Sequence, residues 1–328
     1  MAACLQNGIS ITDLSIHSGF IEWDGGKVKI IDHFHRVDFL DRIWRGGTAT
    51  FSISTLGYDS IASWQVFSFL VDLGPLYALW ILESYRVADT WTPAYFPTIF
   101  SLAGQFLGIG PVAPLFFFLC IPFHLPASNL ALSRTVWHKS SIPLLPIVLL
   151  LHTSEVLAMF LAPDLSTRHF WTWAWQLTPL WIGLSNVVAE RVFRLVGVSP
   201  SKKWPISSSP KLMLVVLGMI SSSVWVYTLL FSPHSLSTVF IPQGGAQSGF
   251  SPHTRKALQV DELGAFSGTF LWLVYGFFDL YTAGLVGYEW IYYVAALPIV
   301  TLCVGPGTAC LTGWYMRERI IGSKMLKS

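Results

Sequence analysis

Long runs of apolar residues dominate the chain from about residue 61 onward. Each run reaches about 20 residues or more, the length that an α-helix needs to cross the hydrocarbon core of a bilayer. The pattern predicts an all-α, polytopic membrane helix bundle of about seven transmembrane helices. The expected spans lie at about residues 61–82, 94–123, 142–162, 170–192, 212–231, 264–286 and 291–314.

The second apolar run is longer than one span requires. It contains Gly104, Gly108, Gly110, Pro111 and Pro114, residues that bend or break helices. We interpret the run as one long, kinked and tilted helix, and two short re-entrant halves are the alternative. No internal sequence repeat is visible, which weakens the case for a transporter built from inverted halves.

The first 60 residues are polar and differ in character from the rest of the chain. Within them Phe34, Val37, Leu40 and Trp44 recur at helical spacing, which predicts an amphipathic helix that lies on the membrane or caps the bundle. The sequence therefore divides into three parts: an N-terminal polar and amphipathic segment (1–60), a transmembrane bundle that carries the catalytic groups (61–316), and a basic C-terminal tail (317–328).

Composition agrees with a membrane protein. Charged residues make up 12% of the chain, about half the usual share of a soluble domain, and the mean hydropathy is +0.55. The net charge of +2 and the scattered basic residues give no sign of a nucleic-acid partner, so membrane lipids are the expected surroundings. The endoplasmic reticulum is the expected membrane.

Four carboxyl groups stand inside or at the end of apolar runs. Asp72 lies in the first run and Glu83 ends it, Glu155 lies deep in the third, and Asp279 lies in the sixth. An ionisable group in the bilayer is costly and usually functional, so these four residues are the predicted catalytic groups. Asp72 and Glu83 are 11 residues, about three turns, apart and share a helix face.

Two of these acids and a neighbouring histidine also have a structural interpretation, whereas Glu155 and Asp279 are flanked by apolar residues on both sides and favour a functional role. Glu83 would pair with Arg86 at the interface, and Asp72 would hydrogen-bond a neighbouring helix. His152 stands three residues before Glu155 on the same face, where it would tune the carboxyl group or be an ordinary buried histidine. Both interpretations stay open for these residues.

Aromatic residues accompany the predicted acids. Around Asp279 they predict a dry cage in which a carboxyl group stays protonated at pH 7 and aromatic faces stabilise a cation. His152 and Tyr77, which lies near Asp72 on the first span, would contribute to the same kind of pocket. The predicted substrate-binding residues are thus Tyr77, His152, Trp272, Tyr275, Phe278 and Tyr281.

Common cofactor motifs are missing from the sequence. No D-D-x-x-D run, H-E-x-x-H, G-x-S-x-G or phosphate-binding P-loop sequence occurs, and the four cysteines show no metal-binding spacing. Gly108-Ile109-Gly110 is interpreted as a helix-packing surface. The sequence thus predicts acid–base chemistry on an apolar substrate, with no metal and no cofactor.

Two segments resemble a known group of enzymes. The run Leu70-Val-Asp-Leu-Gly-Pro-Leu-Tyr-Ala-Leu-Trp-Ile-Leu-Glu-Ser-Tyr-Arg86 and the run from Gln105 to Phe117 resemble fungal integral-membrane terpene cyclases of meroterpenoid biosynthesis, of the ascofuranone and macrophorin type. The resemblance implies that an acid protonates a terminal epoxide or olefin of a lipophilic, prenylated precursor, which then cyclises through carbocations. A proton-coupled transporter and a sterol-isomerase-like enzyme are the alternatives.

Overall fold

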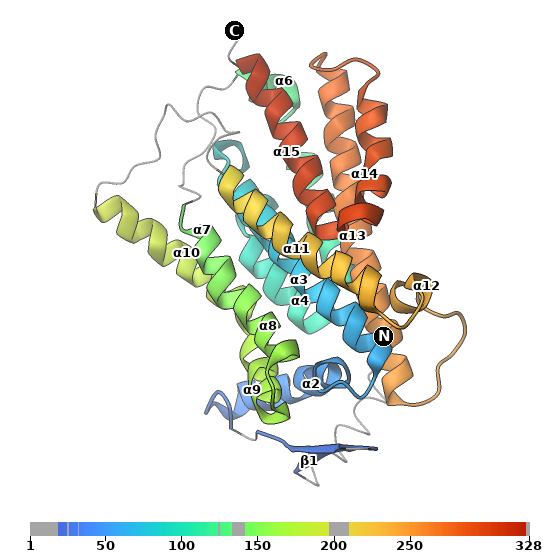
Figure 1. The fold of residues 1–328 in the computed structure, drawn as a ribbon. Helices are drawn as coiled ribbons and strands as arrows, with labels where there is room; N and C mark the ends of the chain where they lie inside the picture. Colours follow the sequence, from blue (N-terminus) through green and yellow to red (C-terminus); the bar gives the residue numbers. More distant parts are fainter. Residues whose placement is uncertain are drawn as a thin grey trace.

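The computed structural model describes residues 19–24, 26–31, 33–123, 125–132, 142–196 and 210–325. These residues form a helical bundle with one small antiparallel hairpin, β1 (Phe20–Trp23) and β2 (Gly26–Lys29), below one end of it (Figure 1). The prediction of an all-α protein is confirmed at this level, because the hairpin is short and lies outside the bundle.

Four helices are long and apolar enough to cross a membrane. They are α3 (Ser60–Ser84), the continuous helix α7–α8 (Leu144–Leu161), α11 (Lys211–Phe231) and α13 (Phe250–Thr282). Helix α3 is buried along its apolar length, and α11, α13 and α15 (Pro306–Met325) pack around it. Helix α3 therefore lies at the centre of the protein core.

The second apolar run is a helical hairpin rather than one kinked helix. Helices α4 (Pro97–Leu107) and α5 (Ile109–Cys120) are separated by Gly108, whose φ of 89° favours glycine. The rings of Phe100 and Phe116, which lie eight residues before and after Gly108, are 5.0 Å apart. The run therefore turns back on itself, as in the re-entrant alternative.

The seventh apolar run forms a second hairpin of the same kind. Helices α14 (Trp290–Val304) and α15 meet at Gly305, which has a φ of 87°. A methyl group added at Gly313 would lie 3.0 Å from Leu297, and these two positions are again eight residues either side of the bend. The fourth run is also divided, into α9 (Leu165–Trp175) and α10 (Thr178–Leu195).

The structure therefore does not show the seven predicted spans. Hydropathy measures how apolar a segment is, and it does not detect a reversal of the chain at a single glycine. Two of the predicted spans turn back at such glycines, and one is divided into shorter helices. The remaining short elements are η1 (Val87–Asp89), η2 (Pro93–Tyr95), η3 (Ile121–Phe123), α6 (Ala127–Leu132) and α12 (Leu236–Phe240).

The predicted amphipathic helix is α2 (Asp38–Thr55), which begins and ends later than the sequence pattern suggested. It packs against α3 and α9 and caps one end of the bundle. Trp44 is buried and stacks on Phe106 near the tip of the α4–α5 hairpin, at a centroid distance of 4.8 Å. Val37, in contrast, precedes the helix and is exposed.

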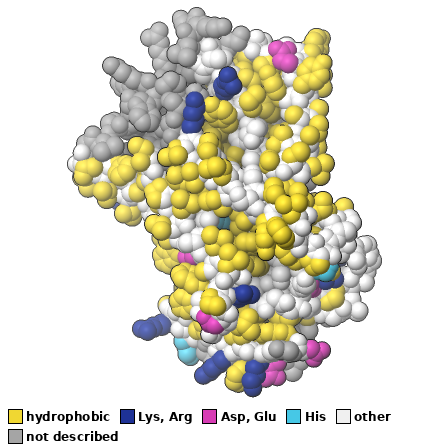
Figure 2. Space-filling view, viewed as in Figure 1, with side chains coloured by type: hydrophobic (Ala, Val, Ile, Leu, Met, Phe, Trp, Pro, Cys, Tyr) yellow, Lys and Arg dark blue, Asp and Glu magenta, His cyan; other side chains and the backbone are white. Residues whose placement is uncertain are grey.

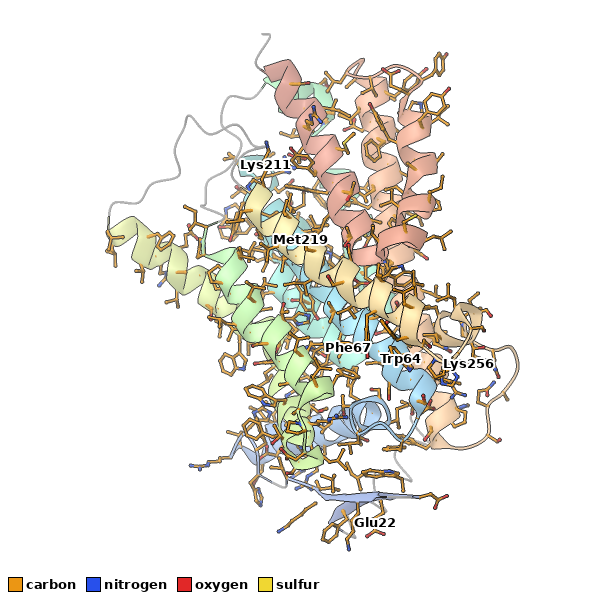
Figure 3. All side chains as sticks on the ribbon, in the orientation of Figure 1. Glu22, Trp64, Phe67, Lys211, Met219 and Lys256 are labelled. Atoms are coloured by element: carbon orange, nitrogen blue, oxygen red, sulfur yellow. The ribbon has the colours of Figure 1, made fainter. Side chains whose placement is uncertain are left out.

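The surface of the bundle is largely apolar between two more polar ends. Hydrophobic side chains cover most of the face shown in Figure 2, whereas several Lys, Arg, Asp and Glu side chains gather beside β1 and α2. Figure 3 places Lys211 at one end of α11 and Lys256 near the opposite end of the bundle, with Met219, Trp64 and Phe67 between them. This distribution is compatible with an apolar belt that contacts lipid.

Candidate functional site

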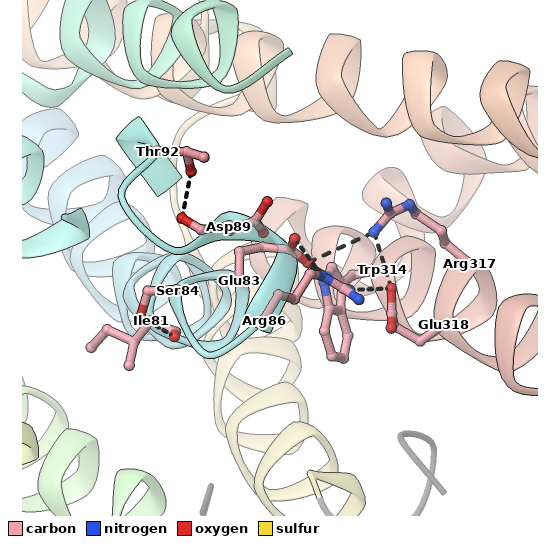
Figure 4. A network of polar contacts seen from close by, with 9 residues as sticks. All are labelled: Ile81, Glu83, Ser84, Arg86, Asp89, Thr92, Trp314, Arg317 and Glu318. Carbon is pink, nitrogen blue, oxygen red and sulfur yellow. Dashed lines mark hydrogen bonds and ion pairs between the residues drawn. The ribbon is translucent and has the colours of Figure 1, made fainter. Parts of the chain in front are cut away.

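The largest group of buried charged residues lies where α3 ends (Figure 4). Arg86 Nε donates a hydrogen bond of 2.8 Å to Glu83, and its Nη2 donates one of 2.5 Å to Glu318 of α15. Arg317 Nη1 donates to Glu318 at 3.0 Å and lies 3.7 Å from Glu83. Trp314 Nε1 completes the cluster with a hydrogen bond of 2.5 Å to Glu83.

Asp89 adds a third acid to this charge cluster. It lies on η1 just beyond the end of α3 and is 2% exposed. Burial and the neighbouring carboxylates of Glu83 and Glu318 raise the pKa of Asp89 to about 7, although Arg86 and Arg317 oppose that rise. A buried acid that titrates near neutrality among charged partners is a recognised mark of a functional site.

Two predicted residues of α13 approach the same cluster. The Trp272 ring is 5.8 Å from the guanidinium carbon of Arg317, a cation–π distance, and it stacks on Phe117 at 4.8 Å. Asp279 accepts a hydrogen bond of 2.8 Å from the backbone of Ala127, at the start of α6. The structure thus brings Glu83 and Trp272 to one region, with Asp279 beside it.

The other aromatic residues predicted around Asp279 do not enclose it. Tyr275 is 39% exposed and Phe278 is 45% exposed on the outer surface of the bundle. Phe278 and Tyr281 contact Trp290 of α14 instead. No aromatic cage forms around Asp279 among these described residues, because Tyr275 and Phe278 lie on the outer side of α13.

Asp72 lies away from the charge cluster, in the centre of the bundle. Its carboxylate accepts a hydrogen bond of 2.5 Å from Ser221 of α11 and lies against the backbone of Gly307 at the start of α15. Asp72 is 1% exposed and Glu83 is 5% exposed, so both acids of α3 face the interior. They do not share a site.

His152 has both ring nitrogens engaged by groups other than Glu155. Nε2 donates to the carbonyl of Leu70 at 2.7 Å, and Nδ1 accepts from Trp175 at 3.3 Å. The ring of Tyr77 lies edge-on to it at 5.4 Å. This set of partners fits a neutral imidazole that fixes the packing between α3, α7–α8 and α9.

Glu155 is hydrogen-bonded to Thr178, at the start of α10. The π-helical turn Leu149–Thr153 precedes Glu155 and changes the direction in which the following side chains project. Among the described residues, no hydrogen bond joins Glu155 to His152, although the sequence spacing placed them on one face.

An apolar groove begins one helical turn beyond Thr178. It lies between α7 and α10, has a volume of about 540 Å³ and opens on the outer surface of the bundle. Trp181, three residues after Thr178, forms part of its wall, so Glu155 and Thr178 lie near one end. Its lining residues are Ile142, Pro143, Pro146, Ile147, Trp181, Leu184, Ser185, Val188, Ala189 and Phe193.

Two acids of α13, the half-buried Asp261 and the buried Glu262, lie outside the predicted spans. Asp261 accepts hydrogen bonds from the backbone of Gly110 at 2.6 Å and Ile109 at 3.2 Å, and so occupies the N-terminal end of α5. Glu262 accepts one of 2.7 Å from Gln65 of α3. Helix α13 begins 14 residues before the apolar run at residue 264, so both acids were assigned to a loop.

Gly108-Ile109-Gly110 serves helix packing, as interpreted from the sequence. A methyl group added at Gly110 would lie 2.7 Å from the backbone of Asp261, and one added at Gly264 would lie 2.7 Å from the backbone of Gly110. The two glycines therefore let α5 and α13 approach closely.

These features define a helical bundle with several buried acids and with helices long and apolar enough to cross a membrane. Among the described residues, no group of three His, Cys, Asp or Glu side chains is placed to hold a metal ion. The chain belongs to the CtvD domain family, whose model matches residues 5–322. No solved structure matches the chain.

Its curated relatives are fungal secondary-metabolism proteins. The FAD-dependent monooxygenase verC1 of Penicillium polonicum is 29% identical over 92% of this chain and 38% of its own length. The FAD-dependent monooxygenase anuJ of Penicillium roqueforti is 26% identical over 91% of this chain and 37% of its own length. The chain therefore spans less than two fifths of the relatives that it matches.

The relatives correct the functional prediction. Their names indicate an oxidative function, so the prediction of a protonation-initiated terpene cyclase, with its isomerase and lyase classes, is wrong. The alternatives of a proton-coupled transporter and a sterol-isomerase-like enzyme are overturned by the same finding. The fungal secondary-metabolism setting and the membrane association agree with the sequence prediction.

The described residues do not fit the FAD that these names imply. Residues 108–113 read G-I-G-P-V-A and match the G-x-G-x-x-A spacing of dinucleotide-binding turns, which follow a parallel strand. Here the turn follows helix α4, and the carboxylate of Asp261 occupies the backbone N–H groups that would face a phosphate. A pyrophosphate would meet a negative charge at this position instead of a helix N-terminus open to anions.

Proposed function

We propose that this chain is the membrane-embedded, flavin-free part of an oxidative system of fungal secondary metabolism. One observation carries the proposal: nearly the whole chain aligns with only 38% of a protein named as an FAD-dependent monooxygenase, yet in the described part of the chain the dinucleotide-like turn at Gly108–Ala113 is occupied by the carboxylate of Asp261. Flavin chemistry is therefore assigned to a separate part of the system, and this chain contributes substrate binding and proton exchange.

The α7–α10 groove supports a lipophilic small molecule as the ligand. Its walls are apolar apart from Ser185, and it opens where the bundle presents apolar side chains to its surroundings. A ligand dissolved in the bilayer would enter sideways, with Glu155 and Thr178 near one end of the groove. A prenylated ligand and an endoplasmic reticulum location stay predictions from the sequence.

The first test asks whether FAD binding lies outside the region that corresponds to this chain. We expect the chain purified in detergent to carry no flavin absorbance. A verC1 protein lacking the region matched by this chain should keep its FAD and lose oxygenation of its lipophilic substrate in membranes. Fusion of this chain to the truncated verC1 should restore part of that oxygenation. Stoichiometric FAD in the purified chain, or full turnover by the truncated verC1, would contradict the proposal.

A second test concerns the groove. We expect Ala189→Trp to fill the groove and to lower product formation by the fusion at least tenfold, with unchanged expression and melting temperature. Val187→Trp is the matched control, because Val187 lies on the same helix, is 43% exposed and does not line the groove. Equal activity of the two tryptophan variants would exclude the groove as the binding site.

A further inference from the structure

Three polar residues form a stripe along the buried face of α3. Gln65, Ser68 and Asp72 are spaced by three and four residues, so they follow one another on one side of the helix over about 10 Å. Each is at most 1% exposed. Gln65 Oε1, Ser68 Oγ and Asp72 Oδ2 have no hydrogen-bond partner among the described residues.

Orphaned polar atoms are rare in protein interiors and need an explanation. Three of them in consecutive turns of one helix are groups of the kind that buried water molecules bridge. The stripe carries an acid near each end, and the two acids have different surroundings.

Glu262 faces the first residue of the stripe. Gln65 Nε2 donates to it at 2.7 Å and also donates to the carbonyl of Leu258 at 3.3 Å. The neighbouring residue, Asp261, is also an acid, and its carboxylate accepts a hydrogen bond from the backbone of Gly110 at the start of α5. No arginine, lysine or histidine forms an ion pair with Glu262 among the described residues, so a negative charge there would be costly and the neutral acid is favoured.

Asp72, at the other end, is also buried, but its surroundings stabilise a carboxylate better than those of Glu262 do. The hydroxyl group of Ser221 donates to one oxygen at 2.5 Å. The same carboxylate lies against Gly307 in the first turn of α15, where the helix dipole stabilises negative charge. Two acids whose surroundings stabilise a carboxylate to different degrees can act as a proton donor and acceptor.

We propose that Glu262 and Asp72 are a proton donor and acceptor connected through Ser68 and the water molecules of the α3 stripe. A proton leaves the carboxyl group of Glu262, is relayed by exchange along the hydrogen-bonded chain, and binds Oδ2 of Asp72. Glu262 becomes a carboxylate, Asp72 becomes a neutral acid, and no electrons move. The proposal goes beyond the proposed function, because it holds whatever molecule occupies the groove.

Infrared spectroscopy of the full chain in lipid nanodiscs tests the protonation states. We expect a carboxylic acid C=O band that is lost in Glu262→Gln and kept in Asp72→Asn. Labelling with ¹³C-glutamate should shift this band in the unchanged protein, which keeps the test valid if Glu262→Gln fails to fold. A band lost in Asp72→Asn instead, or no glutamate band at all, would overturn the proposal.

Thermal stability tests the hydration of the stripe. If water bridges Ser68, Ser68→Ala removes a hydrogen-bonded group and lowers Tm. If the stripe is dry, the same change removes an orphaned hydroxyl group and leaves Tm equal or higher. The control is Ser223→Ala on α11, where the hydroxyl group is exposed and bonds the carbonyl of Met219. A Tm of Ser68→Ala at or above that of the control would overturn the hydrated path.

Discussion

Replacement of Arg86 by methionine is expected to lower the free energy of unfolding by about 3–5 kcal/mol. Arg86 is 1% exposed and bonds both Glu83 and Glu318, so its loss leaves two buried carboxylates with only the remaining partners, Arg317 and Trp314. Uncompensated buried charge is among the largest single causes of instability. Reversible unfolding of the chain in detergent micelles measures the change.

The matched control is Arg255→Met. Arg255 also pairs with an aspartate, Asp59, at 3.0 Å, but its side chain is 20% exposed. Arg255 is partly solvated, so its loss should cost less than the loss of Arg86. Adding Glu318→Gln to Arg86→Met should recover part of the stability. Equal losses for the two arginine variants would show that the charge cluster is not a special element of the fold.

The second large effect is a pH dependence that comes from Asp89. In the folded protein the pKa of Asp89 is about 7, against 3.8 for an ordinary aspartate. Between these two values the folded state keeps a proton that the unfolded state has lost, so stability falls as the pH rises from about 4 to about 7. At higher pH the penalty is constant, with an upper limit of about 4 kcal/mol.

Asp89→Asn should remove this penalty. We expect the variant and the unchanged protein to have similar stability near pH 4, and the variant to be more stable by a few kcal/mol at pH 8. Asp164→Asn is the control, because Asp164 is exposed and hydrogen bonds from Ser166 and Thr167 lower its pKa to about 2. Its replacement should give no gain at pH 8, and a stability difference for Asp89→Asn that does not change with pH would contradict the assignment.

Composition and apolar run length were sufficient to predict an all-helical protein with helices long and apolar enough to cross a membrane. They measure a property of each segment alone, and a bilayer-spanning helix is defined largely by that property. The burial of Asp72 and Glu83 also followed from helix geometry. The partners of these acids did not, since Glu318 is 232 residues from Arg86 and Ser221 is 149 residues from Asp72.

The acids of α13 show why an apolar-run analysis misses polar groups. Asp261 and Glu262 lower the hydropathy of their own segment, so the run appears to begin after them. In the folded protein, Gln65 and the N-terminal end of α5 provide the hydrogen bonds that let these acids lie inside. The oxidative function was missed because the one turn with dinucleotide-binding spacing, residues 108–113, packs against Asp261 in the described structure and follows a helix instead of a strand.

The bend at Gly108 also determines on which side of the membrane the chain emerges. Because α4 and α5 fold back on each other, the chain segments before α4 and after α5 lie at the same end of this hairpin. A topology count that takes residues 94–123 as one crossing would therefore place the loop that follows Phe123 on the wrong side of a membrane. Reporter tags inserted on either side of the α4–α5 hairpin would be exposed together, to the cytosol or to the lumen.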